Sequence, residues 1–409
     1  MATDPVSMET VGTTQRGAAA SGLRILRRRR MHRLVILATS ALALAACSSS
    51  DGGNTNTTAT SDADVIATGP TSSSAELGRI IFVRESLDGS GRHVFSIDPD
   101  GTGEIQLIAP AAETPLLSPD GSRLAFECLD GDLVRVCMAD ADGSDPQMLS
   151  PDVSDMPHPI DNYAPRAWSP DGEQLVLIGF GGAPAGIFTM PASDGGELVR
   201  VTTSPVVHMD DTLALSPDGS RIVFLRTPIA DDHDADVYVV AADGTGLVRL
   251  SPPGMAVECC VAPDWSPDGS RIVFAGTFGY PSATDEWAIY AIDPDGSDRQ
   301  RISPLEGWVF APAWSPDGRT IAFTRSAIDG AQISVVNPDG TDLVQVTDRW
   351  DSNGSYNAVW SPDGSQLVFQ HGDGGQVSDL WVIDADGTGL LQLTDTPEGE
   401  GPSWWSATG

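Results

Sequence analysis

The sequence predicts an all-β protein, a seven-bladed β-propeller built from four-stranded antiparallel blades. The main observation is a repeated turn phrase, Ser-Pro-Asp-Gly, whose copies are separated by 51, 47, 50, 49 and 46 residues. The copies begin at Ser118, Ser169, Ser216, Ser266, Ser315 and Ser361. A nearly constant period of about fifty residues, with only strand signals between the copies, is typical of a propeller in which each repeat forms one blade.

The chemistry of this phrase fits a tight reversal between two antiparallel strands. In a type I turn, serine at the first position bonds back to the chain, proline presets φ at the second, and glycine takes the left-handed position that follows. A short apolar strand comes after each copy, for example Arg-Ile-Val-Phe at 221–224. The phrase is therefore expected to join the first and second strands of each blade.

A second family of turns, ending in Asp-Gly, follows these strands. Its seven copies begin at Asp98, Asp140, Ala192, Ala241, Asp293, Asn337 and Asp384. Apolar strands lie on both sides of each copy, for example Val-Tyr-Val-Val at 237–240. One repeat thus contains four strands, and four antiparallel strands form one blade.

The Ser-Pro-Asp-Gly turns count six blades and the second family of turns counts seven. The ends of the chain explain the difference. The first unit begins at Gly78–Phe82, which matches the second strand of a blade, so its opening strand is missing. The segment Gly401–Ser406 matches an opening strand. We expect this C-terminal strand to pair into the first blade and close the ring, which removes the exposed edges of an open array. Six and eight blades are the alternatives.

The phrase Trp-Ser-Pro-Asp-Gly at 168–172, 265–269, 314–318 and 360–364 resembles the repeats of the TolB-like propeller family. The resemblance covers residues 76–409, without the α/β domain that precedes the propeller in TolB of the Tol–Pal system. It implies the fold and says little about function. We interpret the repeated tryptophans as core residues wedged between blades.

Residues 1–46 are predicted to be a signal peptide that ends in a bacterial lipobox. Arginines precede a short apolar run at 34–46, too short to span a bilayer, and the run ends at Cys47. Residues 47–75 form a Ser/Thr/Gly/Asn tether with few apolar groups, expected to be disordered. We therefore expect a lipoprotein attached through Cys47 to the extracytoplasmic side of a membrane, in the periplasm or at the cell surface. An ordinary signal peptide is the alternative, and Met31 is a second candidate initiator.

The chain is strongly acidic, with 57 acidic and 23 basic residues, a net charge of −34 and no lysine. This charge argues against nucleic-acid binding and against contact with anionic lipid beyond the anchor. Attraction of a basic partner is one interpretation. The recurrence of aspartate in every turn is the other, and we expect a monomer.

Four cysteines lie in the predicted propeller. Cys128 and Cys137 flank a short loop in the second blade, so a local disulfide is feasible in an oxidising compartment. Cys259 and Cys260 are predicted to form a strained vicinal disulfide or to remain free.

Strand alternation places both regular turn families on one face of the ring and the irregular loops on the other. Variable loops on a rigid scaffold are where such folds usually bind. The irregular loops are predicted at 150–164, 203–211, 227–236, 252–263, 277–287, 305–311 and 348–357. The candidate binding residues in them are His158, Asp161, His208, Asp210, Asp211, His233, Tyr280, Trp308, Trp350 and Tyr356. Solvated loop residues are the alternative reading of this set.

No cofactor is expected, although the acidic run at 231–236 offers oxygen ligands for Ca²⁺. Nucleophile-elbow, P-loop, dinucleotide-binding and His-Glu-x-x-His motifs are missing from the sequence. The sequence therefore favours a non-catalytic module that binds an envelope protein, peptide or other envelope component. The alternative is a polysaccharide lyase or other metal-assisted glycan-active enzyme, since some sugar lyases resemble TolB-like propellers. Its candidate metal ligands are His158, His208, His233 and His371.

Overall fold

The computed structural model divides the chain into two units, Met1–Ala46 and Cys47–Gly409. Within the second unit the structure describes residues 78–87, 91–109, 113–149, 162–181, 185–204, 208–228, 235–257, 263–278, 287–305, 308–327, 330–348, 354–372 and 377–405. The lipobox cysteine, the tether and the pair Cys259–Cys260 lie outside these residues, so the predictions for them remain predictions.

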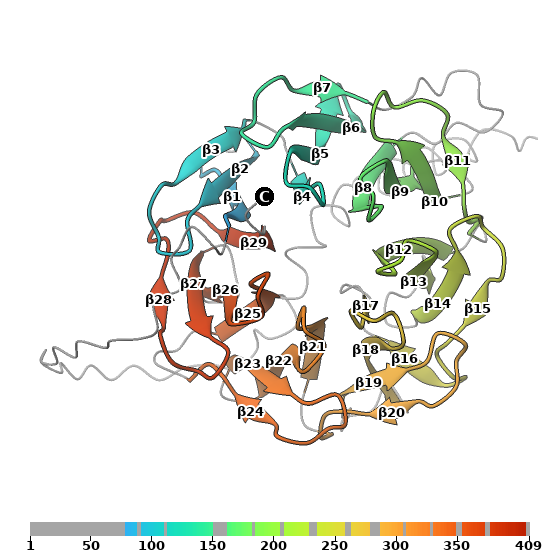
Figure 1. Cartoon of the computed structure of the whole chain (residues 1–409), viewed down its shortest axis with the longest axis vertical. Helices are drawn as coiled ribbons and strands as arrows, with labels where there is room; N and C mark the ends of the chain where they lie inside the picture. Colours follow the sequence, from blue (N-terminus) through green and yellow to red (C-terminus); the bar gives the residue numbers. More distant parts are fainter. Residues whose placement is uncertain are drawn as a thin grey trace, which may run out of the picture. The chain divides into compact units, whose positions relative to one another are not determined.

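The described residues form seven antiparallel sheets arranged as the blades of a propeller (Figure 1). The strands of each blade are named in their paired order, from the strand nearest the centre of the ring to the strand at its periphery (Figure 1). Blades 1 to 3 are β29 (Glu400–Trp405), β1 (Ile80–Glu85), β2 (Arg92–Ile97), β3 (Ile105–Ile108); β4 (Glu113–Leu117), β5 (Arg123–Asp130), β6 (Leu133–Asp140), β7 (Gln147–Met148); and β8 (Asn162–Trp168), β9 (Gln174–Phe180), β10 (Gly186–Pro191), β11 (Val199–Arg200).

The remaining four blades repeat this order. They are β12 (His208–Leu215), β13 (Arg221–Pro228), β14 (Asp236–Ala241), β15 (Val248–Arg249); β16 (Met255–Val257) with β17 (Asp264–Trp265), β18 (Ile272–Phe278), β19 (Ala288–Ile292), β20 (Gln300–Arg301); β21 (Trp308–Trp314), β22 (Ile321–Ala327), β23 (Gly330–Val336), β24 (Val344–Gln345); and β25 (Gly354–Trp360), β26 (Gln366–Gly372), β27 (Ser378–Asp384), β28 (Leu391–Gln392). The seven-bladed architecture is the predicted one.

The ring closes through the C-terminal strand, as expected. β29 pairs antiparallel with β1, with Trp405 opposite Ile80 and Glu400 opposite Arg84. The innermost strand of blade 1 therefore comes from the far end of the sequence, and Figure 1 shows it beside the first strands of the chain. This pairing gives β1 a partner on its inner edge.

The Ser-Pro-Asp-Gly phrases form the expected turns, and their aspartates organise them. In the fourth blade the Gly219 amide donates to the Ser216 carbonyl at 2.8 Å. The Asp218 carboxylate accepts bonds from the Ser216 hydroxyl (2.6 Å) and from the Ser220 amide (3.0 Å). These donors lower the pKa of Asp218 to about 2, because they stabilise the ionised form.

The core lies between adjacent blades. The tryptophans that end the inner strands, Trp168, Trp265, Trp314 and Trp360, are 9%, 4%, 8% and 7% exposed, as expected for core residues. Trp265, for example, packs with Phe274 of its own blade and Val239 of the preceding one.

The inner strands are longer than the sequence predicted. Asp210, Trp308 and Tyr356 were expected in loops, but they lie within β12, β21 and β25. A β-bulge in these strands breaks the alternation of apolar residues, which hides the start of each strand in the sequence. Residues with positive φ mark these bulges, among them Thr212 (38°), Ala311 (52°) and Asn357 (53°).

Candidate functional site

We call the edge of the propeller where the inner strands begin and the second strands end the irregular-loop rim. Five predicted site residues, His158, Asp161, His233, Tyr280 and Trp350, lie outside the described residues. For His208 and Asp211 the structure gives only the backbone, in β12. Asp210, Trp308 and Tyr356 are described in full.

Trp308 begins β21 at this rim and is partly exposed. Its ring stacks on that of Trp287, with centroids 4.9 Å apart and an interplanar angle of 20°. Trp287 is completely buried, in the hydrophobic cluster between blades 5 and 6. The rim therefore presents a partly exposed aromatic ring whose orientation is fixed by stacking on the buried Trp287, as a binding anchor requires.

Tyr356, the second described aromatic of the predicted site, lies on the neighbouring inner strand. It is partly exposed, and its ring stacks on Phe310 with centroids 6.5 Å apart. The next residue, Asn357, has a φ of 53° and donates a side-chain bond to Gln370 Oε1 at 2.9 Å. A left-handed asparagine with a hydrogen-bonded side chain holds the bulge that positions Tyr356.

Asp210 has a structural role. Its side chain is fully buried and makes a bidentate ion pair with Arg226, whose Nε and Nη2 lie 2.6 and 2.8 Å from the two carboxylate oxygens. The Thr202 hydroxyl of the preceding blade donates to Asp210 Oδ2 at 2.6 Å. The Arg226 pair joins the first two strands of blade 4, and the Thr202 bond ties blade 3 to blade 4. With its oxygens engaged in these bonds, Asp210 is poorly placed to contact a ligand.

The same arrangement recurs at the ring closure, where sequence reasoning missed it. Arg84 pairs with the buried carboxylate of Glu400, and the Thr394 hydroxyl of blade 7 donates to the same carboxylate. Despite these partners, burial raises the pKa of Glu400. Arginine recurs at this position of the second strand, as Arg84, Arg226 and Arg325 in blades 1, 4 and 6, and this recurrence is a signal that comparison between the repeats offers.

A third charged cluster, also missed, lies where β4 begins. Glu113 lies directly opposite Glu127, and Arg166 of blade 3 donates to Glu127 Oε1 at 2.8 Å. The Thr114 hydroxyl donates to the same oxygen at 2.7 Å. Burial raises the pKa of Glu113, and repulsion by Glu127 adds to this, while Arg92 opposes it.

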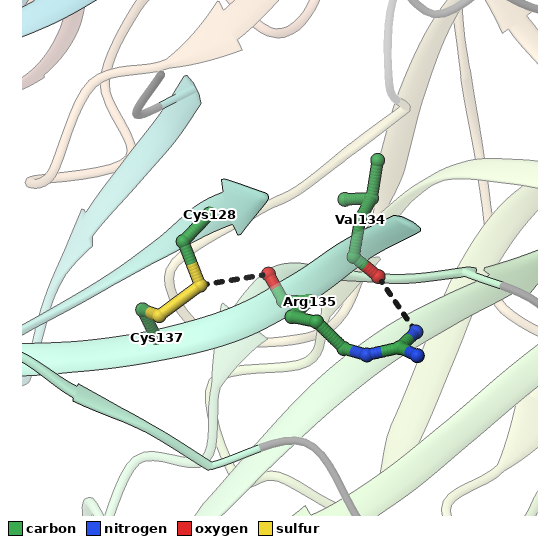
Figure 2. The surroundings of a disulfide bond; sticks show 4 residues. All are labelled: Cys128, Val134, Arg135 and Cys137. Carbon is green, nitrogen blue, oxygen red and sulfur yellow. Dashed lines mark hydrogen bonds between the residues drawn. A yellow bond between two sulfur atoms is a disulfide. The ribbon is translucent and has the colours of Figure 1, made fainter. Parts of the chain in front are cut away.

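Cys128 and Cys137 form a disulfide across β5 and β6, with Cα atoms 5.8 Å apart (Figure 2). They are diagonal partners, because Cys128 lies opposite Arg135 and Cys137 lies opposite Phe126. Their sulfur atoms therefore meet on one face of the sheet.

Blades 1 and 4 fill the same diagonal with aromatic contacts. The Arg226 guanidinium lies 4.9 Å from the centroid of Tyr238 in blade 4, and the Arg84 guanidinium lies 4.4 Å from that of Phe95 in blade 1. In blade 7 a histidine takes the position of the arginine. His371, 5% exposed, contacts the Ser355 hydroxyl through Nδ1 at 3.2 Å and packs edge-on against Trp381.

The described residues offer little for metal chemistry. No group of three or more His, Cys, Asp and Glu side chains in the described ranges could hold a metal ion. Asp236, at the end of the acidic run proposed for Ca²⁺, is already bound by Arg249 (2.6 Å) and by the Ser251 hydroxyl (2.7 Å). Within the described part of the chain, no helix is long and apolar enough to cross a membrane.

Residues 254–408 match the family model described as the TolB beta propeller domain. A segment of 51 residues is 43% identical to the Tol-Pal system protein TolB of Anaeromyxobacter dehalogenans. The segment spans 12% of this chain and 12% of that relative, so it concerns about one repeat.

Solved structures share the fold at low identity. An oligogalacturonate lyase from Vibrio parahaemolyticus has a TM-score of 0.54 and 13% identity, and the match covers 74% of this chain and 91% of that one. A puromycin-hydrolysing peptidase of Mycobacterium tuberculosis has a TM-score of 0.58 and 19% identity, with 79% and 54% covered. Such likeness extends to the propeller and not to either activity.

Proposed function

Because the described residues form a seven-bladed propeller of which residues 254–408 match the TolB beta propeller domain, we propose that the chain is a lipid-anchored, extracytoplasmic binding module. It holds an envelope protein or peptide at its irregular-loop rim without catalysis. The observation that carries this proposal is Trp308, a partly exposed ring supported by the buried Trp287. Rigid aromatic anchors of this kind dominate the energetics of protein interfaces. Tyr356 adds a second aromatic on the adjacent inner strand.

Two features support the compartment and the orientation. The disulfide Cys128–Cys137 is a bond that persists in oxidising compartments. The described chain enters the propeller just before β1, which corresponds to the strand after a Ser-Pro-Asp-Gly turn. The proposed tether from Cys47 would therefore join the propeller on its regular-turn side, which leaves the irregular-loop rim free for a partner.

The alternative, a metal-assisted glycan-active enzyme, rests on histidines. Of its four candidate ligands, only His371 has a described side chain, and this side chain is buried against Ser355 and Trp381. His371 is therefore poorly placed to bind a metal ion, whereas Trp308 is a described residue that supports binding. Metal analysis of the purified protein distinguishes the two, since stoichiometric Mn²⁺ or Zn²⁺ that is lost in His208→Ala favours the enzyme.

A matched pair of variants tests the binding module in native cells. Trp308→Ala removes the anchor, whereas Val344→Ala removes a 46%-exposed apolar side chain from β24, the outer strand of the same blade. We expect the Trp308 variant to lose more than about tenfold of the partner complex on native gels. The control should retain the complex. Equal recovery from both variants would contradict the proposal.

A Cys47→Ser variant tests the anchor separately. We expect it to move from the membrane fraction to the soluble fraction, since the proposed anchor depends on acylation of the Cys47 thiol. Unchanged membrane association in detergent-free fractions would contradict lipid attachment at Cys47.

A further inference from the structure

Three of the tryptophans that lie between blades are tied to the preceding blade by one kind of bond. The indole N–H donates to the carbonyl of the penultimate residue of the preceding inner strand. The pairs are Trp168 with Leu116 (3.0 Å), Trp265 with Ala214 (3.2 Å) and Trp360 with Ala313 (3.1 Å). This bond satisfies a buried donor and fixes the spacing of the two blades.

The seam between blades 5 and 6 differs. By the same register, the Trp314 indole should donate to the carbonyl of Asp264, but its Nε1 is buried without a hydrogen-bond partner among the described residues. The Asp264 side chain bonds instead, since its Oδ2 accepts from the Trp314 backbone amide at 2.7 Å. Its Oδ1 accepts from the Trp265 amide at 2.9 Å. A buried indole N–H without a partner among the described residues, on a residue whose backbone amide is held by a carboxylate, indicates a seam with a second arrangement.

Asp264 is also exceptional for its position in the blade. The penultimate residues of β4, β8, β12, β21 and β25 are apolar: Leu116, Ala167, Ala214, Ala313 and Val359. The described inner strand of blade 5 also consists of two pieces, because β16 ends at Val257 opposite Gly276 and β17 begins at Asp264 opposite Val273. Asp264 thus begins a two-residue strand, β17, that pairs with β18.

The strands packed against β17 bring no opposite charge to the Asp264 carboxylate. β18 and β21 contain no ionisable residue at all. The ionisable residues of β12, which are His208, Asp210 and Asp211, lie at the opposite end of that strand. The Arg221 guanidinium lies over the ring of the adjacent Trp265, 4.9 Å from its centroid. Although part of the residue is exposed, protein surrounds the carboxylate, and this burial raises the pKa of Asp264 to about 6.

We propose that Asp264 is a proton-dependent latch between blades 5 and 6. The protonated carboxyl stays in the seam and keeps its bond to the Trp314 amide. The ionised carboxylate turns toward solvent, keeps the bond from the adjacent Trp265 amide and releases the Trp314 amide. The Trp314 indole then donates to the Asp264 carbonyl, as the indoles of Trp168, Trp265 and Trp360 donate to the carbonyls of their preceding blades. The change transfers one proton to solvent and exchanges one hydrogen bond for another.

The latch acts on the strand that presents the proposed anchor. β21 ends at Trp314 and begins at Trp308, and both residues contact the same hydrophobic cluster. A shift at the Trp314 end is therefore transmitted to the Trp308 end through one short strand. This consequence rests on the proposed function, and it makes partner binding at the rim sensitive to pH between about 5 and 7.

Fluorine NMR of the full chain labelled with 5-fluorotryptophan tests the latch, because the label reports the indole environment directly. The chain has 10 tryptophans, and Trp314→Phe identifies the Trp314 signal. We expect this signal to shift with a midpoint near pH 6 in the unaltered protein. The signal should stay constant from about pH 4.5 to 7.5 in both Asp264→Ala and Asp264→Asn. The alanine variant copies the penultimate residue of β8, β12 and β21.

Asp145→Asn is the matched control, because it removes an exposed carboxylate at a left-handed position that asparagine tolerates. Its Trp314 signal should titrate as in the unaltered protein. A constant signal in the unaltered protein, or the same titration in Asp264→Ala, would overturn the latch.

The coupling to binding has its own readout. The yield of partner adduct from a photo-crosslinker at Trp308 should differ by about threefold or more between pH 5 and pH 7.5, and Asp264→Ala should remove the difference. A Trp314 titration without any adduct contradicts the proposed function and leaves the latch standing. An adduct of equal yield at both pH values contradicts the coupling.

Discussion

Cys128 is bonded to Cys137 along the diagonal of blade 2 that an arginine and an aromatic ring span in blades 1 and 4. The disulfide therefore replaces a cation–π contact at the rim end of the second and third strands. Both contacts hold the hairpin between these strands, the disulfide by a covalent bond and the other by charge and dispersion.

Removal of this disulfide should destabilise the propeller moderately. The bond closes a loop with a sequence separation of 9, so Cys128→Ser with Cys137→Ser should lower the free energy of unfolding by about 2–3 kcal/mol. Chemical denaturation at constant pH measures the loss. The double variant Cys128→Arg with Cys137→Tyr, which rebuilds the contact of blade 4, should recover part of it. If the rebuilt pair is no more stable than the serine pair, the two diagonals are not equivalent.

The buried ion pair Asp210–Arg226 should be costly to break. Arg226→Ala leaves the Asp210 carboxylate buried without its bidentate partner, and we expect a loss of about 3–5 kcal/mol in the free energy of unfolding. Arg249→Ala, in the same blade, removes a guanidinium that is 38% exposed and should cost about 1 kcal/mol or less. Urea unfolding of both variants tests the contrast. Similar losses would show that burial of the pair is not decisive.

Asp264 should make the propeller less stable as the pH rises. Its pKa in the folded protein, about 6, lies above the ordinary 3.8, so its contribution is complete below pH 4 and is lost as the pH passes through 6. Asp264→Asn should remove this dependence. The difference in unfolding free energy between the two proteins should grow by about 2–3 kcal/mol from pH 4 to pH 7. A constant difference over this range would contradict the raised pKa.

The turn aspartates have lowered pKa values, in contrast to the raised pKa of Asp264. The Ser216 hydroxyl is the largest cause of the low pKa of Asp218, and the Ser220 amide and hydroxyl follow. Ser216→Ala should therefore raise the pKa of Asp218 more than Ser220→Ala does. Carboxyl ¹³C NMR titration from about pH 1.5 to 5 measures both changes. The reverse order would show that Ser220 dominates the turn.

The fold was predictable because its information is local and repeated. Ser-Pro-Asp-Gly specifies a turn by itself, and the unmatched ends, Gly78–Phe82 and Gly401–Ser406, identify the closing strand by comparison with the other repeats. The disulfide partners are also near in sequence. In each case the relevant residues lie close together or recur at a fixed period.

The contacts at the rim were not predictable in the same way. Asp210 and Glu400 are acidic residues near strand starts, and their own sequence positions do not distinguish a buried carboxylate from a solvated one. Only the arginine on the second strand hints at the pairing. Asp264 precedes Trp265 after an interrupted strand, so it resembles a loop residue. The bulges shift which side chains face inward, and this shift depends on pairing between strands rather than on the order of residues.

Site-specific photo-crosslinking in the native cell tests the central claim most directly. One probe, an aromatic photo-crosslinking residue that keeps a ring at the anchor position, replaces Trp308 at the irregular-loop rim. The same residue replaces Asp339 in an exposed regular turn of the same blade as the control. The binding module predicts a discrete protein adduct from position 308 and none from position 339. Adducts of equal yield from both positions, or none from either, would contradict binding at the irregular-loop rim.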